Sequence, residues 1–125
     1  MSSSYRDLVA WQKSMVLVRQ IYKATTSYPS SELYGLVSQI RRAAVSIPCN
    51  IAEGQGRTSP GEFHQFLGNA RGSLLEVQTL LEISASLDFI DSEELKTLMK
   101  MTEEVLRILN GLISSVKTLK AAAAT

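Results

Sequence analysis

The sequence predicts an all-α protein folded as an antiparallel, up-and-down four-helix bundle. In four successive segments, apolar residues recur every three or four positions, the spacing that keeps side chains on one helical stripe. Proline, glycine or a capping residue separates each segment from the next. No segment shows the sustained alternation of apolar and polar residues that is typical of a half-exposed strand. With 125 residues, a single domain spanning 1–125 is expected.

The first helix is expected at about 7–27. Its apolar stripe consists of Leu8, Trp11, Met15, Val18 and Tyr22. Pro29 follows shortly afterwards, and because the residue before a proline is pushed out of the helical region, the helix ends before it.

The second helix is expected at about 33–56. Its apolar stripe continues to Ile51, and two glycines then provide a stop. Pro48 lies inside the pattern, where it lacks a backbone donor and crowds the carbonyl four residues earlier. A kink near 44–48 is therefore expected, but not a break.

The third and fourth helices are expected at about 60–87 and 92–120, each after a capping signal. Ser59 is followed by a proline and, three residues after the cap, by Glu62. Asp91 precedes the fourth helix in the same way, with acids in the first turn. The short connections return each helix beside its predecessor, which is the up-and-down topology.

Composition and charge exclude several classes of protein. Hydrophobic residues make up 45% and charged residues 20%, which are values of globular proteins and not of disordered ones. The start of the chain lacks a signal peptide pattern, and no apolar run approaches the ~18 residues of a membrane span. Cys49 is the lone cysteine, which fits a reducing compartment. We therefore expect a cytoplasmic protein without a membrane partner.

The residue set predicts neither an enzyme nor a metal site. Catalysis by a nucleophile or a metal needs several convergent groups, yet the chain has one histidine and one cysteine. The Glu-x-x-His pairs of a di-iron bundle are also absent, because Gly61 stands three residues before His64. No cofactor and no catalytic residue are expected.

Positive charge is concentrated in the first half of the chain. Residues 1–57 carry seven Lys or Arg against three acids, a net of +4, whereas residues 58–125 carry six against nine, a net of −3. Arg41, Arg42 and Arg57 are candidate phosphate ligands, because guanidinium groups match phosphate oxygens bidentately. The alternative interpretation is an ordinary solvated surface.

Two further stripes lie away from the apolar core. One on the second helix collects Gln39, Arg42, Ser46, Asn50, Glu53 and Arg57. It is either a solvated helix back or a subunit contact. One on the third helix collects Gly61, Gly68 and Gly72. Each mid-helix glycine costs roughly 1 kcal/mol relative to alanine, so this stripe indicates either close packing between subunits or a thin exposed surface without a partner.

Two long blocks carry a family resemblance: ELYGLVSQIRRAAVSIPCNIAEGQGR and SPGEFHQFLGNARGSLLEVQTLLEI. Together with YRDLVAWQKSMVLV near the start, they resemble the four-helix bundle proteins encoded within intervening sequences of bacterial 23S ribosomal RNA genes. That family is similar in turn to the accessory variability determinant of diversity-generating retroelements. The latter is a pentameric bundle with a basic surface that is associated with nucleic acid and a reverse transcriptase.

The resemblance implies a homopentamer without catalytic activity. The partners that it implies are RNA, DNA or a nucleic-acid-processing protein. It also implies that the site lies among Arg41, Arg42, Ser46, Asn50, Glu53, Gly54, Gly56, Arg57, Arg71, Gly72 and Ser73.

Two functions of different classes remain open. The first is a non-catalytic oligomer that binds structured nucleic acid through phosphates. Its binding residues would be Arg41, Arg42, Arg57 and Arg71. The second is a protein–protein adaptor or assembly scaffold with no nucleic-acid affinity. Its subunit or partner contacts would be Ser46, Asn50, Glu53, Gly68 and Gly72. Salt dependence distinguishes the two, because only binding through phosphates weakens steeply with salt.

Overall fold

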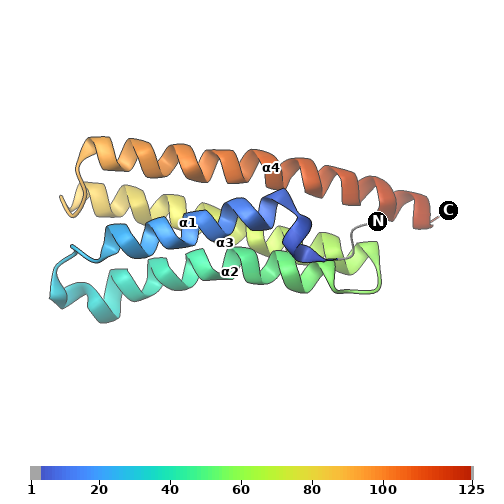
Figure 1. The fold of residues 1–125 in the computed structure, drawn as a ribbon, viewed down its shortest axis with the longest axis horizontal. Helices are drawn as coiled ribbons and strands as arrows, with labels where there is room; N and C mark the ends of the chain where they lie inside the picture. The colour runs from blue at the N-terminus through green and yellow to red at the C-terminus, as the bar shows by residue number, and fades with distance from the viewer. Residues whose placement is uncertain (1–3, 125) are drawn as a thin grey trace.

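Four long α-helices run antiparallel in the computed structural model, which describes residues 4–124 (Figure 1). They are α1 (Val9–Thr25), α2 (Ser38–Gln55), α3 (Pro60–Ser86) and α4 (Ser92–Ala124). α2 packs against α1 and α3, and α4 packs against α3 and α1, so each helix lies beside its neighbours in the sequence. The described residues form no strand. The predicted four-helix bundle is confirmed.

The first helix is preceded by a separate turn. A 3₁₀ turn, η1 (Tyr5–Asp7), is held by the Ser4 hydroxyl, which accepts the Arg6 backbone N–H at 3.1 Å. Leu8 then adopts an extended conformation, with φ of −77° and ψ of 123°, so α1 starts at Val9. α1 thus begins two residues later and ends two residues earlier than predicted. Periodicity alone does not detect the break at Leu8 that sets its start.

An irregular segment leads into α2. A 3₁₀ turn, η2 (Ser30–Glu32), is followed by a π-helical turn, η3 (Leu33–Val37), in which Gly35 leaves the helical region with φ of −110° and ψ of −108°. The Glu32 carboxylate accepts the Leu36 N–H at 3.3 Å and caps this turn. α2 itself continues through Pro48 without a break, as predicted. A kink that was not predicted lies at Gly35, where the backbone leaves the helical region.

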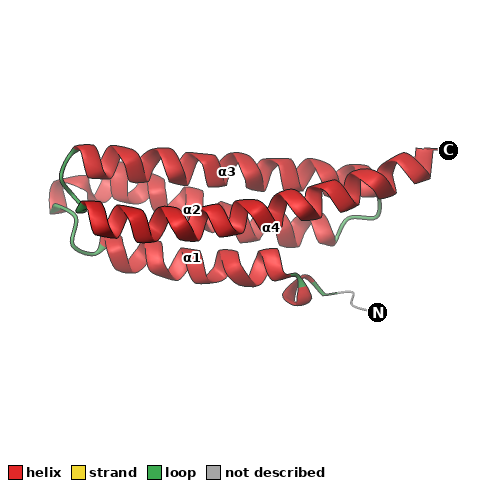
Figure 2. Cartoon of the chain, turned by 90° about the horizontal axis from the view of Figure 1, so that it is seen from above, coloured by secondary structure: helices red, strands yellow, loops and turns green. Residues whose placement is uncertain are grey.

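The predicted caps of α3 and α4 are confirmed. The Ser59 hydroxyl accepts the Glu62 N–H and donates to the Glu62 carboxylate, both at 3.2 Å. The Asp91 carboxylate accepts the Glu94 N–H at 2.8 Å. α4 continues to Ala124, past the predicted end near 120, and its last turns extend beyond the other helices (Figures 1 and 2).

All four helices contribute side chains to one apolar core. The largest fully buried side chains include Leu17, Ile21, Ile40, Ile47, Ile51, Leu67, Leu74, Leu81 and Leu109. Thr102, a polar residue of α4, is also fully buried. Its hydroxyl donates to the Met99 carbonyl at 2.6 Å and accepts the Gln78 amide at 3.0 Å, so its burial leaves no polar group unsatisfied.

The connection from α3 to α4 contains a non-glycine residue in the left-handed region. Asp88 has φ of 63°, where a glycine would avoid the steric cost of a Cβ. We expect Asp88→Gly to raise the free energy of unfolding by about 0.5 kcal/mol, measured by urea unfolding. Glu82→Gly, at an exposed position inside α3, is the control and should lower it by up to about 1 kcal/mol. Equal losses in both variants would contradict the role assigned to Asp88.

Candidate functional site

The positive charge of the first half of the chain lies on the α1–α2 side of the bundle. α1 carries Lys13, Arg19 and Lys23 and no acid. α2 carries Arg41 and Arg42 and one acid, Glu53. α3 has the opposite balance, with Glu62, Glu76 and Glu82 against Arg71. The fold therefore separates a basic helical hairpin from an acidic helix.

A groove of about 440 Å³ lies between α1 and α2, toward their connection. It is lined by Tyr22, Leu33, Tyr34, Val37, Ser38, Arg41, Arg42 and Val45, and we call it the arginine groove. Arg41 is held in place on one wall. Its Nε donates to the Thr25 hydroxyl at 2.9 Å, its Nη2 donates to the Tyr22 carbonyl at 3.2 Å, and its guanidinium lies 4.6 Å from the centre of the Tyr22 ring.

Arg42 lies beside Arg41 and is exposed. Within residues 4–124, its side chain has no hydrogen bond, ion pair or ring contact. An arginine carries five N–H donors, so the full donor set of Arg42 faces solvent at the groove. Glu32 directly precedes Leu33, a residue of this groove, but its carboxylate already accepts the Leu36 backbone N–H. The arginine groove therefore presents one fixed and one free guanidinium.

The other two predicted arginines lie elsewhere. Arg57 pairs with Glu53 at 3.0 Å, and its guanidinium lies 4.7 Å from the centre of the Phe66 ring. α2 ends at Gln55, 13 residues and roughly 20 Å along the helix axis from Arg42, and Arg57 lies beyond that end. Arg71 donates to the Asn110 amide oxygen at 3.0 Å, across α3 and α4. The four arginines do not converge on one site.

The polar stripe of α2 faces α3 within the same chain. The hydroxyls of Ser46 and Ser73 share a hydrogen bond of 2.9 Å, and the Asn50 amide donates to the Ser46 hydroxyl and carbonyl at 2.9 and 2.8 Å. These side chains are half-buried. Gln39 extends the same contact by donating to Glu76 at 3.4 Å. The geometry assigns Ser46 and Asn50 to the packing of α2 on α3, and leaves Glu53 paired with Arg57.

The glycines of α2 and α3 have contrasting surroundings. A Cβ on Gly54 would lie 2.7 Å from Phe66 Cβ and 3.0 Å from Phe63 Cδ1, so the backbone of α2 approaches α3 closely there. A Cβ on Gly68 or Gly72 would meet no atom within 4 Å. Both of these glycines are exposed and face away from the bundle.

Exposed apolar side chains continue the face on which Gly68 and Gly72 lie. Leu75 and Ile83 are 38% and 40% exposed, and the helical period places them on that side of α3. We call this face the α3 outer stripe, defined by Gly68, Gly72, Leu75, Thr79 and Ile83.

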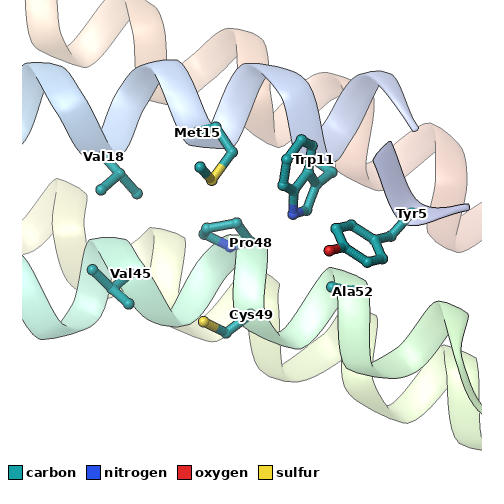
Figure 3. Close-up of a pocket in the computed structure, with 8 residues that line it drawn as sticks. All are labelled: Tyr5, Trp11, Met15, Val18, Val45, Pro48, Cys49 and Ala52. Atoms are coloured by element: carbon teal, nitrogen blue, oxygen red, sulfur yellow. The ribbon is translucent and has the colours of Figure 1, made fainter. Parts of the chain in front are cut away.

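A second groove between α1 and α2 is apolar and was not predicted. It has a volume of about 450 Å³ and is lined by Tyr5, Trp11, Met15, Val18, Val45, Pro48, Cys49 and Ala52, so we call it the aromatic groove. Figure 3 shows the α1 side chains facing those of α2, with Tyr5 at one end. The Tyr5 and Trp11 rings meet edge to face, with 5.1 Å between their centres. Val45 lines both grooves, so the two adjoin each other.

Titratable groups in the described residues offer little chemistry. No group of three or more His, Cys, Asp or Glu side chains there could hold a metal ion. Cys49 is an exposed thiol in the aromatic groove, and His64 lies half-exposed in the first turn of α3. Burial raises the pKa of the Tyr28 hydroxyl above its usual range, and Glu94 adds to this shift. Across residues 4–124, none of the helices has both the length and the apolarity that a membrane crossing requires.

Fold and surface together define a small antiparallel helical bundle with adjoining basic and apolar grooves. The chain belongs to the 23S rRNA-intervening sequence protein family, whose model matches residues 6–111. The resemblance to this family that the sequence shows is thus confirmed. The family description names no catalytic activity.

A solved structure shares the fold. A protein of unknown function from the S23 ribosomal protein family of Bacteroides thetaiotaomicron is 24% identical, with a TM-score of 0.76. The match covers 84% of this chain and 98% of that one. At this level of identity the likeness supports the fold and not a shared activity. No curated protein matches the chain.

Proposed function

We propose that this protein is a non-catalytic, oligomeric, cytoplasmic protein that binds the phosphates of structured RNA or DNA in the arginine groove. The observation that carries the proposal is Arg42, which is exposed and without a partner in the described structure, beside the fixed Arg41. Guanidinium groups bind phosphate oxygens bidentately, and they remain charged at any physiological pH.

The two arginines would contribute differently to binding. Arg41 is already oriented by Thr25 and Tyr22, so it loses little side-chain freedom when a phosphate arrives. Arg42 supplies its unused donors at a larger entropic cost. The net charge of +4 over residues 1–57 attracts a polyanion to this side of the bundle and steers its approach.

Replacing Arg42 by alanine tests the proposed phosphate site. We expect weaker binding to RNA hairpins and to duplex DNA alike, because a phosphate contact carries no sequence information. The slope of log affinity against log salt should become shallower by about 1. Fluorescence anisotropy at several salt concentrations measures both quantities.

Arg71→Ala is the matched control for Arg42→Ala. It removes the same group from α3, where Arg71 is bonded to Asn110 outside the arginine groove. We expect its affinity and salt slope to match those of the unmodified protein. Equal effects of the two substitutions, or no effect of Arg42→Ala, would remove Arg42 from the binding site.

We also propose that copies of the chain assemble head to tail, with the α3 outer stripe of one copy in the aromatic groove of the next. The groove offers an uncovered apolar surface, and the stripe offers the exposed side chains of Leu75 and Ile83. Gly68 and Gly72 would let the partner backbone approach closely. The acidic α3 complements the basic α1–α2 side. Contacts between two different surfaces are heterologous, and they form a closed ring such as a homopentamer when the rotation from one copy to the next closes.

The second candidate function is a protein adaptor or assembly scaffold without nucleic-acid affinity. The aromatic groove favours it, because an uncovered apolar groove between two helices suits a helix or aromatic anchor of a partner protein. This alternative predicts no binding to polyanions even at low salt. Titration of the unmodified protein with RNA and DNA at low salt therefore separates the two functions.

A further inference from the structure

Tyr34 is the most exposed large apolar side chain in the described part of the protein. It is 93% exposed, although the ring of a tyrosine ordinarily buries a large area in a core or an interface. Three other apolar side chains of the arginine groove are also exposed to an unusual degree: Leu33 at 47%, Tyr22 at 42% and Val45 at 36%. The groove thus combines exposed apolar side chains with two guanidinium groups.

The two tyrosines of the arginine groove differ in what they can still bind. Arg41 lies over the ring of Tyr22, 4.6 Å from its centre, so one face of that ring is already occupied. Tyr34 has no ring contact in residues 4–124, and nearly all of its surface faces solvent. Tyr34 is carried by the π-helical turn Leu33–Val37, next to the bend at Gly35.

A flat apolar ring beside free cationic donors is the combination that recognises single-stranded nucleic acid. Bases stack on aromatic rings regardless of sequence, because every base has a π face, while arginines hold the adjacent phosphates. Unpaired bases in loops and ends can turn outward, whereas paired bases in a helix are stacked on one another and expose only their edges. A ring on the rim of a groove therefore distinguishes unpaired from paired nucleic acid.

We propose that Tyr34 stacks on an unpaired base of a single-stranded segment whose phosphates are held by Arg41 and Arg42. This inference rests on the proposed function and narrows its ligand from nucleic acid in general to an unpaired stretch. The phosphate contacts serve paired and unpaired ligands alike. Tyr34 adds a contact that only the unpaired ligand makes.

The test compares one labelled strand of about 16 nucleotides with the same strand annealed to its complement. Both are titrated by fluorescence anisotropy with the full chain and with Tyr34→Ala, Tyr34→Phe and Arg42→Ala. Tyr34→Ala should weaken binding of the single strand about 5- to 150-fold, leave its salt slope unchanged, and leave binding of the duplex within about twofold. Tyr34→Phe, which keeps the ring, should bind the single strand as the unmodified protein does.

The outcomes separate this inference from the proposed function. If Arg42→Ala weakens binding while Tyr34→Ala does not, the stacking role is wrong and the phosphate site stands. If Tyr34→Ala weakens strand and duplex equally, or changes the native mass, the ring serves another contact and the inference is overturned. If the unmodified protein binds neither ligand, both proposals fail. Because Tyr34 is almost fully exposed, its replacement should leave helicity and thermal unfolding unchanged.

Discussion

Gly54→Ala is expected to lower the free energy of unfolding by about 2 kcal/mol. The added Cβ would lie 2.7 Å from Phe66 Cβ, which is attached directly to the α3 backbone and has little freedom to move away. Overpacking of this kind costs up to about 3 kcal/mol, and the better helix propensity of alanine offsets about 1 kcal/mol. Urea unfolding at a fixed protein concentration measures the difference.

Gly111→Ala is the control for Gly54→Ala. Gly111 lies in α4, is exposed, and would place its Cβ in open space. The same substitution should there raise the free energy of unfolding by about 1 kcal/mol. If both variants gained stability, α2 and α3 would not pack as closely as the structure has them.

Gly72→Leu is expected to break the proposed assembly while the chain stays folded. In the isolated chain the position is open, so a leucine there meets nothing within 4 Å of its Cβ. In the proposed ring, the leucine would keep the partner backbone away from the α3 outer stripe at every interface. Native mass spectrometry should therefore show a single oligomer for the unmodified protein and monomers for the variant. Circular dichroism should show equal helicity for both.

Gly111→Leu provides the comparison for Gly72→Leu. It places the same side chain at an equally open helical position, outside the α3 outer stripe. Its native mass should equal that of the unmodified protein. An unchanged mass for Gly72→Leu would show that the α3 outer stripe is not a subunit contact.

Local signals in the sequence predicted most of the fold. The caps at Ser59 and Asp91 depend on residues within three positions of one another, and both form as expected. The bend at Gly35, inside the turn that precedes α2, could not be predicted in this way, because a single glycine within a helical pattern is compatible with an unbroken helix. Leu119, near the end of α4, is 59% exposed and lines a pocket beside the α2–α3 connection.

The candidate site was predicted less completely than the fold. The sequence identifies Arg41 and Arg42 as neighbours, and the structure places both in one groove. The sequence could not predict the hydrogen bond between Ser46 and Ser73, because 27 residues separate the two serines along the chain.

The aromatic groove was missed for a related reason. Trp11, Met15 and Val18 follow the apolar period, which identifies a face of α1 but not whether another helix covers it. Cys49 and Val45 on α2 are exposed, which shows that this surface is uncovered. Their exposure is a property of the folded chain and could not be read from the sequence.

The most direct test of nucleic-acid binding in the arginine groove is a titration of the unmodified protein. Fluorescence anisotropy with a structured RNA and with a duplex DNA, at about 50 and 200 mM salt, spans the range over which phosphate contacts weaken sharply. Contacts of two arginines with phosphates predict a slope of log affinity against log salt of about −1.8, so the affinity should fall by about 12-fold between these salt concentrations. No binding at the lower salt concentration, or an affinity that does not change with salt, would contradict the proposed function.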